Sequence, residues 1–161
     1  MPEAHQRATT KGLVFWADDD FGPEESGEQL TPYKVRILRK SGYHVEYEYK
    51  AEPRRLGTWI RRAARVQVNV PKFLVLDQIW PNPLGAEGGW KLYTAHKAAI
   101  LDGFDGVIFY TKNPTRKLGE QIAREGQDVS LMFSLVDGPK KLAEKLDARV
   151  KELRQGNEPG G

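Results

Sequence analysis

The stretch Phe73-Leu-Val-Leu-Asp-Gln-Ile-Trp-Pro-Asn-Pro-Leu-Gly85 is the clearest structural signal in the chain. Its first four residues are apolar and lead directly into a single acid, Asp77. A segment that is apolar on both faces is typical of a central strand in a parallel sheet. The carboxyl ends of such strands form the edge at which open α/β folds bind ligands. We therefore expect Asp77 to lie at the mouth of a binding site.

Four further segments have the pattern of strands, and segments with helical spacing separate them. The predicted strands cover 13–17, 44–50, 73–77, 106–111 and 129–135, and the clean alternation of 44–50 indicates a half-buried edge strand. The predicted helices cover 32–41, 53–65, 89–101, a segment after Thr115, and 139–153. Thr31 is the expected cap of the first helix, with Pro32 as its first residue. This alternation predicts one α/β domain with a doubly wound, parallel (βα)₅ sheet of the flavodoxin-like class.

The predicted domain covers 12–154. A flexible N-terminal lead, 1–11, precedes it, and a disordered tail, 155–161, follows it. Few residues remain after the last helix, so we expect a stand-alone module without an output domain.

The composition of the 161-residue chain narrows its chemistry. The chain has no cysteine, which excludes disulfides and thiolate zinc sites and favours a cytoplasmic location. No apolar run approaches the ~20 residues that a membrane span needs, so we expect no membrane partner. The net charge of +3 is too small to imply nucleic acid by itself. The helix over 53–65 carries five arginines, which form either a solvated face or a surface for an acidic partner.

Polar residues follow three of the predicted strands where each strand ends. Asp18 and Asp19 follow the first strand, Asp77 ends the third, and Thr111 ends the fourth. In a doubly wound sheet these ends converge at the switch point. Carboxylate oxygens suit Mg²⁺, and Asp77 could then accept a phosphoryl group as a nucleophile while the Thr111 hydroxyl bonds a phosphoryl oxygen. The alternative is structural, because acids after strands are also common turn and cap residues.

This ordered set of residues resembles the receiver domain of two-component response regulators. The resemblance covers 12–153 and rests on the acid pair, the strand-end acid, the Pro and Gly that follow it, and the later hydroxyl: Asp18, Asp19, Asp77, Pro81, Gly85 and Thr111. It implies Mg²⁺ bound by Asp18, Asp19 and Asp77, with Asp77 as the phosphoacceptor. It also implies a histidine kinase or phosphotransfer protein as donor.

The resemblance further implies a downstream protein target, contacted through the fourth helix, fifth strand and fifth helix. A homodimer is left open. No turnover is implied beyond self-phosphorylation and self-dephosphorylation, so we do not expect an enzyme in the usual sense.

The chain departs from the receiver pattern in four places, one of which is a long loop after the first strand. The family has Lys-Pro after the fifth strand, where this chain aligns Ser134-Leu135. Lys112 follows Thr111 where the family has a small residue, and it would either block the pocket or replace the missing lysine. Trp80 is a bulky residue beside the pocket. These departures leave open a pseudo-receiver, in which the fold serves as an interaction module without phosphorylation.

A second alternative is a haloacid-dehalogenase-type phosphatase. In that interpretation Asp18 is the nucleophile, Asp20 the acid/base and Thr111 the second hydroxyl. The later acid pair such an enzyme needs would be Asp102 and Asp105, which precede the fourth strand and so lie at its wrong end.

Overall fold

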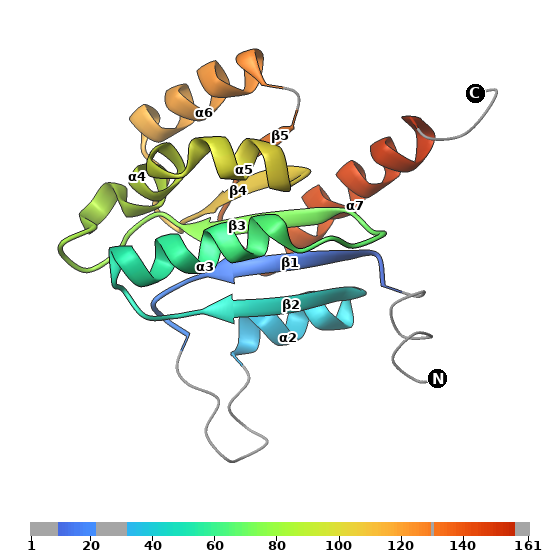
Figure 1. The fold of residues 1–161 in the computed structure, drawn as a ribbon, viewed down its shortest axis with the longest axis horizontal. Helices are drawn as coiled ribbons and strands as arrows, with labels where there is room; N and C mark the ends of the chain where they lie inside the picture. The colour runs from blue at the N-terminus through green and yellow to red at the C-terminus, as the bar shows by residue number, and fades with distance from the viewer. Residues whose placement is uncertain (1–9, 22–31, 130, 157–161) are drawn as a thin grey trace.

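A five-stranded parallel sheet runs through the centre of the chain, with the strands in the order β2-β1-β3-β4-β5 (Figure 1). The computed structural model describes residues 10–21, 32–129 and 131–156. The strands are β1 (Gly12–Ala17), β2 (Tyr43–Glu48), β3 (Lys72–Asp77), β4 (Gly106–Tyr110) and β5 (Met132–Val136). The helices are α2 (Tyr33–Lys40), α3 (Pro53–Arg65), α4 (Gly88–Ala95), α5 (Lys97–Gly103), α6 (Arg116–Asp128) and α7 (Pro139–Gly156), and a short 3₁₀ turn, η1 (Gly85–Glu87), precedes α4. The predicted class, a single α/β domain with flavodoxin-like topology, is confirmed.

The register places the ends of β1, β3 and β4 at one edge of the sheet. Ala17 of β1 pairs with Leu76 of β3. The next residue of each segment, Asp18 and Asp77, therefore lies at the same level. Asp77 also pairs with Tyr110, the last residue of β4. Side chains from three separate segments can meet at this edge because parallel strands all end on the same side.

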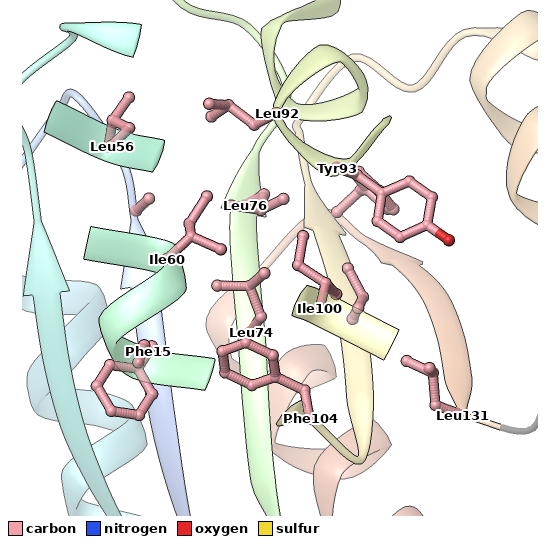
Figure 2. Close-up of a cluster of buried hydrophobic side chains, with 14 of the residues drawn as sticks. Phe15, Leu56, Ile60, Leu74, Leu76, Leu92, Tyr93, Ile100, Phe104 and Leu131 are labelled. Atoms are coloured by element: carbon pink, nitrogen blue, oxygen red, sulfur yellow. The ribbon is translucent and has the colours of Figure 1, made fainter. Parts of the chain in front are cut away.

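Helices cover both faces of the sheet (Figure 1). α3, α4, α5 and α6 pack on one face, and α2 and α7 pack on the other. Figure 2 shows the core on the first face, where Leu56 and Ile60 of α3 gather with Leu74 and Leu76 of β3. All four apolar side chains of β3 are fully buried. Each such side chain contributes roughly 1.5–3 kcal/mol by leaving water, so the central strand is strongly held in place.

β3 begins with a buried lysine that has a structural role. Lys72 Nζ donates to the backbone oxygens of Ala63, Ala64 and Val66, at 2.7, 2.9 and 2.6 Å. These carbonyls lie at the C-terminal end of α3, where oxygens have no partner within the helix and a positive charge is favourable. Lys72 therefore ties the end of α3 to the start of β3.

The first helix begins one residue later than predicted. Pro32 is the N-cap and α2 starts at Tyr33, while Thr31, the expected cap, lies outside the described residues. The end of the helix agrees with the prediction. Ser41 is its C-cap, and Gly42 follows with a φ of 103°, a left-handed conformation that glycine adopts without steric cost.

The predicted helix over 89–101 is two helices, α4 and α5, separated at His96. This residue has a φ of −122° and a ψ of 24°, which are not helical values. Its imidazole lies against Gly57 of α3, where an added Cβ would come within 2.6 Å of Nε2. Its Nδ1 is 3.3 Å from a guanidinium nitrogen of Arg61. The break therefore directs the His96 ring onto α3, which a single straight helix would not do.

The fifth strand begins later than predicted. α6 continues to Asp128, and β5 starts at Met132 instead of Val129. Met132 pairs with Gly106, the first residue of β4. Pairing with the neighbouring strand, rather than the start of the apolar run, sets where this strand begins. Its end consequently moves to Val136.

β2 is an edge strand, as its alternating pattern predicted. The alternation fails at its end, since Glu48 was expected on the solvent face and is only 8% exposed. The Glu48 carboxylate accepts hydrogen bonds from the backbone nitrogen of Tyr49 at 2.9 Å and from Nε of Arg55 at 3.0 Å. These bonds replace the hydration that burial removes.

The arginines of α3 lie mostly in contact with solvent. Arg54, Arg62 and Arg65 are exposed, whereas Arg55 pairs with Glu48. The sequence left two alternatives for these arginines, a solvated face and a surface for an acidic partner. Both stay predictions.

At the chain ends, α7 continues to Gly156, so Gln155 and Gly156 are helical rather than part of the predicted tail. Residues 1–9 and 157–161 lie outside the described part of the chain. Among the helices described here, none is long and apolar enough to cross a membrane.

Gly89, in the first turn of α4, provides a test of how closely this helix approaches β3. An added Cβ would lie 2.5 Å from the backbone oxygen of Asp77 and 3.0 Å from Cα of Gln78. Backbone atoms yield little, so we expect Gly89→Ala to lower the free energy of unfolding by about 1–3 kcal/mol, measured by urea denaturation. Gly119→Ala in α6 is the matched control, since nothing lies within 4 Å of its added Cβ. That change should be neutral or stabilising, and equal losses for both variants would contradict the close contact.

Candidate functional site

The turn after β1 presents an acid at the edge of the sheet. Asp18 continues the strand, and its backbone nitrogen donates to the oxygen of Glu48 at 3.0 Å. Its side-chain Oδ1 accepts from the backbone nitrogen of Asp20 at 2.9 Å, and its backbone oxygen accepts from that of Phe21 at 3.1 Å. These bonds bend the chain immediately after the strand. The Asp18 side chain is thereby held at the carboxyl edge, fully buried.

Carboxylates from two strands gather there. Asp18, Asp19 and Asp20 each offer an oxygen, and these oxygens all lie within 4.8 Å of one another. The carboxyl of Asp77, at the end of β3, lies close enough to Asp18 and Asp19 for their charges to raise its pKa. The structure thus places Asp77 beside the acid pair after β1, but the oxygens that lie within 4.8 Å of one another are those of Asp18, Asp19 and Asp20. It adds Asp20, which is exposed.

The backbone around Asp77 is held by the loop and helix that follow β3. Nε1 of Trp80 donates to the backbone oxygen of Asp77 at 2.6 Å. Trp80 is 3% exposed, so it packs below the edge as part of the core rather than standing in the pocket mouth. The backbone nitrogen of Gly89 donates to the oxygen of Gln78 at 3.1 Å, and Oε1 of Gln78 accepts from the nitrogen of Trp90 at 2.9 Å. These contacts fix where the Asp77 side chain begins.

The acids perturb one another because they are close and poorly solvated. Burial raises the pKa of Asp77 to about 9, and the negative charge of Asp18 and the hydrogen bond and charge of Asp19 add to the rise. Burial also raises the pKa of Asp18, while the hydrogen bond and positive charge of Lys34 offset part of that rise. Asp77 is therefore the carboxyl that we expect to hold a proton without metal, because adjacent carboxylates cannot all ionise cheaply.

Lys34 is a site residue that the sequence did not indicate. It lies in the first turn of α2, and its Nζ is 2.8 Å from Oδ2 of Asp18. The same nitrogen is 4.6 Å from the centre of the Tyr110 ring and 5.4 Å from that of Phe21. One signal was available in principle, because the helix after β1 begins at the edge where β1 ends. Many lysines occupy first turns, however, and the pattern alone does not single this one out.

Aromatic groups form the floor beneath the acids. The Tyr110 ring lies 5.1 Å from that of Trp16, and both side chains are buried. Among the described residues, the Tyr110 hydroxyl and Nε1 of Trp16 have no hydrogen-bond partner. Burial raises the pKa of Tyr110 to about 12, with further increases from the charges of Asp18, Asp137 and Asp77. The hydroxyl is therefore a neutral donor close to the acids.

The two remaining candidates, Thr111 and Lys112, follow β4 and have surroundings that differ from those of the acids. Thr111 is 4% exposed, and its Oγ1 accepts from the backbone nitrogen of Asn113 at 3.2 Å. It also lines a surface groove of about 560 Å³ beside Asp137 and Lys141. Lys112 is exposed. Of the lysines described, Lys34 is the one paired with the acids, so neither predicted role of Lys112 is supported by a contact.

The residue that follows the fifth strand is an acid. Ser134 pairs with Ile108 in the middle of the sheet, so it does not occupy the strand end where the alignment placed it. The strand continues to Val136, and Asp137 comes next. Lys141 pairs with Asp137 at 3.0 Å. The later start and end of β5 account for this difference.

The acids that a phosphatase would need lie elsewhere. Oδ2 of Asp105 accepts from the backbone nitrogen of Lys72 at 2.9 Å, which places it at the start of β3. Asp102 and Asp105 line a second hollow, with Lys72, at that opposite edge of the sheet. They are therefore separated from the acids after β1 by the length of the strands.

The donor set fits a hard divalent cation. Carboxylate oxygens are the ligands that Mg²⁺ prefers, and a cation beside Asp77 would replace the proton that its raised pKa retains. Asp18 pairs with Lys34, and its oxygens lie within 4.8 Å of those of Asp19 and Asp20, so these three acids would hold the ion, with Asp77 beside them.

Fold and site together define a flavodoxin-like α/β domain with an acidic cluster after β1. Comparison with protein families, with curated proteins and with solved structures finds no match to this chain. The resemblance to receivers therefore rests on strand order and on the placement of individual residues.

The raised pKa of Asp77 predicts how stability depends on pH. The folded protein retains a proton that the unfolded chain releases near pH 4, so the free energy of unfolding falls as pH rises from about 4 towards 9. Asp77→Asn removes this titration. We expect the variant, compared with the wild type in EDTA, to gain relative stability as pH rises, measured by urea denaturation across that window.

Asp102→Asn is the control for the pH experiment, because Asp102 is exposed at the opposite edge. Its profile should run parallel to that of the wild type. A parallel profile for Asp77→Asn as well would show that the acids do not interact in the way the structure indicates.

Proposed function

We propose that this chain is an atypical receiver module that accepts a phosphoryl group on Asp77. The observation that carries the proposal is the meeting of Asp77 with Asp18 and Asp19 at the carboxyl edge of a sheet ordered 2-1-3-4-5. Asp77 stands at the end of the central strand, on a backbone held by Trp80 and Gly89. A nucleophile needs this kind of fixed position relative to its charge partners.

The chemistry follows from the Asp77 carboxylate. In the ionised state one of its oxygens attacks the phosphorus of an acyl phosphate or a phosphohistidine. The bond from phosphorus to the donor's oxygen or nitrogen breaks, and its electron pair leaves with the donor. Mg²⁺, when bound, would supply positive charge that favours ionised Asp77 and offsets the charge of the phosphoryl group. Asp19 and Asp20 would hold the ion, and Trp80 keeps the Asp77 backbone in place.

The same proposal assigns the partners. A histidine kinase or phosphotransfer protein would supply the phosphoryl group, and a downstream protein would read the modified state. The groove beside Thr111 supports the assignment of a downstream protein, because it runs along β5 and α7, next to the edge that carries the acids. Asp77 pairs with Tyr110, and the next residue of the chain, Thr111, lines this groove.

A second candidate function has its own support. Asp137 follows β5, so that strand end contributes negative charge, and Lys34 already pairs with Asp18. An edge so arranged can be stable without a phosphoryl group. In this pseudo-receiver the fold is a constitutive interaction module.

Labelling with acetyl phosphate and Mg²⁺ tests the proposed function. We expect slow labelling of the wild type, detected by mass spectrometry as the addition of one phosphoryl group to the peptide that contains Asp77. Asp77→Asn should abolish it, because the amide is not a nucleophile of comparable strength. Asp102→Asn should leave the rate unchanged. Labelling that persists in Asp77→Asn would place the chemistry elsewhere, and no labelling by acetyl phosphate or by any histidine kinase would favour the pseudo-receiver.

Binding of Mn²⁺ or Mg²⁺ tests the acidic cluster separately. We expect a saturable change in tryptophan fluorescence, because Trp16 and Trp80 lie beneath the edge. Asp19→Asn removes a charged ligand and should weaken binding by roughly tenfold or more. Asp102→Asn should bind as the wild type does. If the Asp19 variant keeps full affinity, the cluster is not the metal site.

A further inference from the structure

The position of the Lys34 ammonium follows from two of its contacts taken together with the order of the strands. The nitrogen touches Asp18, which follows β1, and lies over the ring of Tyr110, which ends β4. In the sheet β3 runs between β1 and β4. A group that reaches both flanking strand ends must cross the end of the strand between them. That end is Asp77, whose carboxyl is subject to the charge of Lys34.

The surroundings hold the ammonium in this position. The Lys34 side chain is 19% exposed, and its nitrogen lies near the aromatic faces of Tyr110 and Phe21. Aromatic faces attract cations and also exclude water, which strengthens electrostatic interactions nearby. An ammonium has three N–H donors. The structure shows one of them directed to Asp18, at 2.8 Å, among the described residues.

A second anion at this edge would need a positive partner. A phosphoryl group on Asp77 brings two negative charges next to Asp18 and Asp19, and one divalent cation does not balance them all. The strand end that could supply the missing charge, after β5, carries Asp137 instead. Lys112 is exposed and has no described contact with the acids. Lys34 is already at the required place.

We propose that Lys34, delivered from α2, is the side chain that pairs with the phosphoryl group on Asp77. This rests on the proposed function and adds a residue from an element to which the receiver resemblance assigned no charge. One N–H remains on Asp18, and the others turn to phosphoryl oxygens. Lys34 compensates charge as phosphorus moves from donor to carboxylate, and it neither gives nor takes a proton in that step. Lys34 thereby supplies, from the other side of the pocket, the positive charge that a lysine after β5 would have supplied.

The variants separate charge from packing. Lys34→Met removes the charge and keeps an apolar chain of similar length. Lys34→Gln removes the charge but retains an N–H donor for Asp18, which protects the fold. Lys34→Arg keeps the charge in a different shape. Lys40→Met is the matched control, because its side chain is exposed and lies at the far end of the same helix. Urea denaturation reports whether each variant is folded.

The measured quantity is the rate constant of Asp77 labelling at saturating acetyl phosphate with Mg²⁺. We expect Lys34→Met and Lys34→Gln to lower it by about 10- to 1,000-fold, by analogy with the loss of one charge-stabilising donor. Lys34→Arg should recover part of the rate. Lys40→Met should label as the wild type does. A purely structural role for Lys34 would change the denaturation midpoint without this recovery by arginine.

A second measurement uses the wild-type chain alone, so it does not depend on a variant folding. Beryllofluoride with Mg²⁺ mimics a phosphoryl group on a carboxylate. We expect the NMR signal of the Lys34 side-chain nitrogen to shift when it is added, and that of Lys40 to stay unchanged. If the wild type labels but its Lys34 variants label at the same rate, the proposal is overturned and the receiver function still stands. The same holds if the wild type labels but its Lys34 signal does not move. A wild type that neither labels nor binds beryllofluoride overturns both.

Discussion

The crowding of carboxylates at one sheet edge is the constraint on which the rest of this site depends. Asp18, Asp19 and Asp77 reach the same place because β1 and β3 are neighbours in register. Such groups repel one another and lose hydration when they are packed against a protein interior. The fold can hold them only with compensating positive charge or with protons. The chain uses both, a lysine on Asp18 and a proton that the raised pKa of Asp77 retains.

This constraint also explains what surrounds the acids. Repulsion would push Asp77 away unless its backbone were fixed, and Trp80, Gln78 and the glycines of α4 fix it from the side of the first core. The opposite side supplies α2 with Lys34 and the aromatic floor. The two cores therefore have different tasks at this edge, one holding the backbone and the other supplying charge.

The sequence predicted the sheet well because the strands are apolar on both faces and the acids stand directly at strand ends. The prediction from sequence failed where a tertiary contact determines the boundary of an element or the burial of a side chain. The strand β5 begins where β4 offers a partner, His96 breaks a helix to reach Gly57, and Glu48 is buried by Arg55. The sequence did not indicate Lys34 as a site residue for the same reason. Its importance comes from Tyr110, which is distant in the chain and adjacent only in the folded protein.

Lys72 has a practical consequence for engineering. It binds the last carbonyls of α3 and begins β3, so the segment over 67–70 connects two points that are already anchored to each other. Val66 and Val68 are 40% and 42% exposed, and backbone in such positions tolerates inserted sequence best. A fluorescent or affinity module placed between Gln67 and Val68 would stand on a rigid base. It would leave the opposite edge of the sheet, which carries the acids, uncovered, so this turn is a suitable attachment point for a reporter.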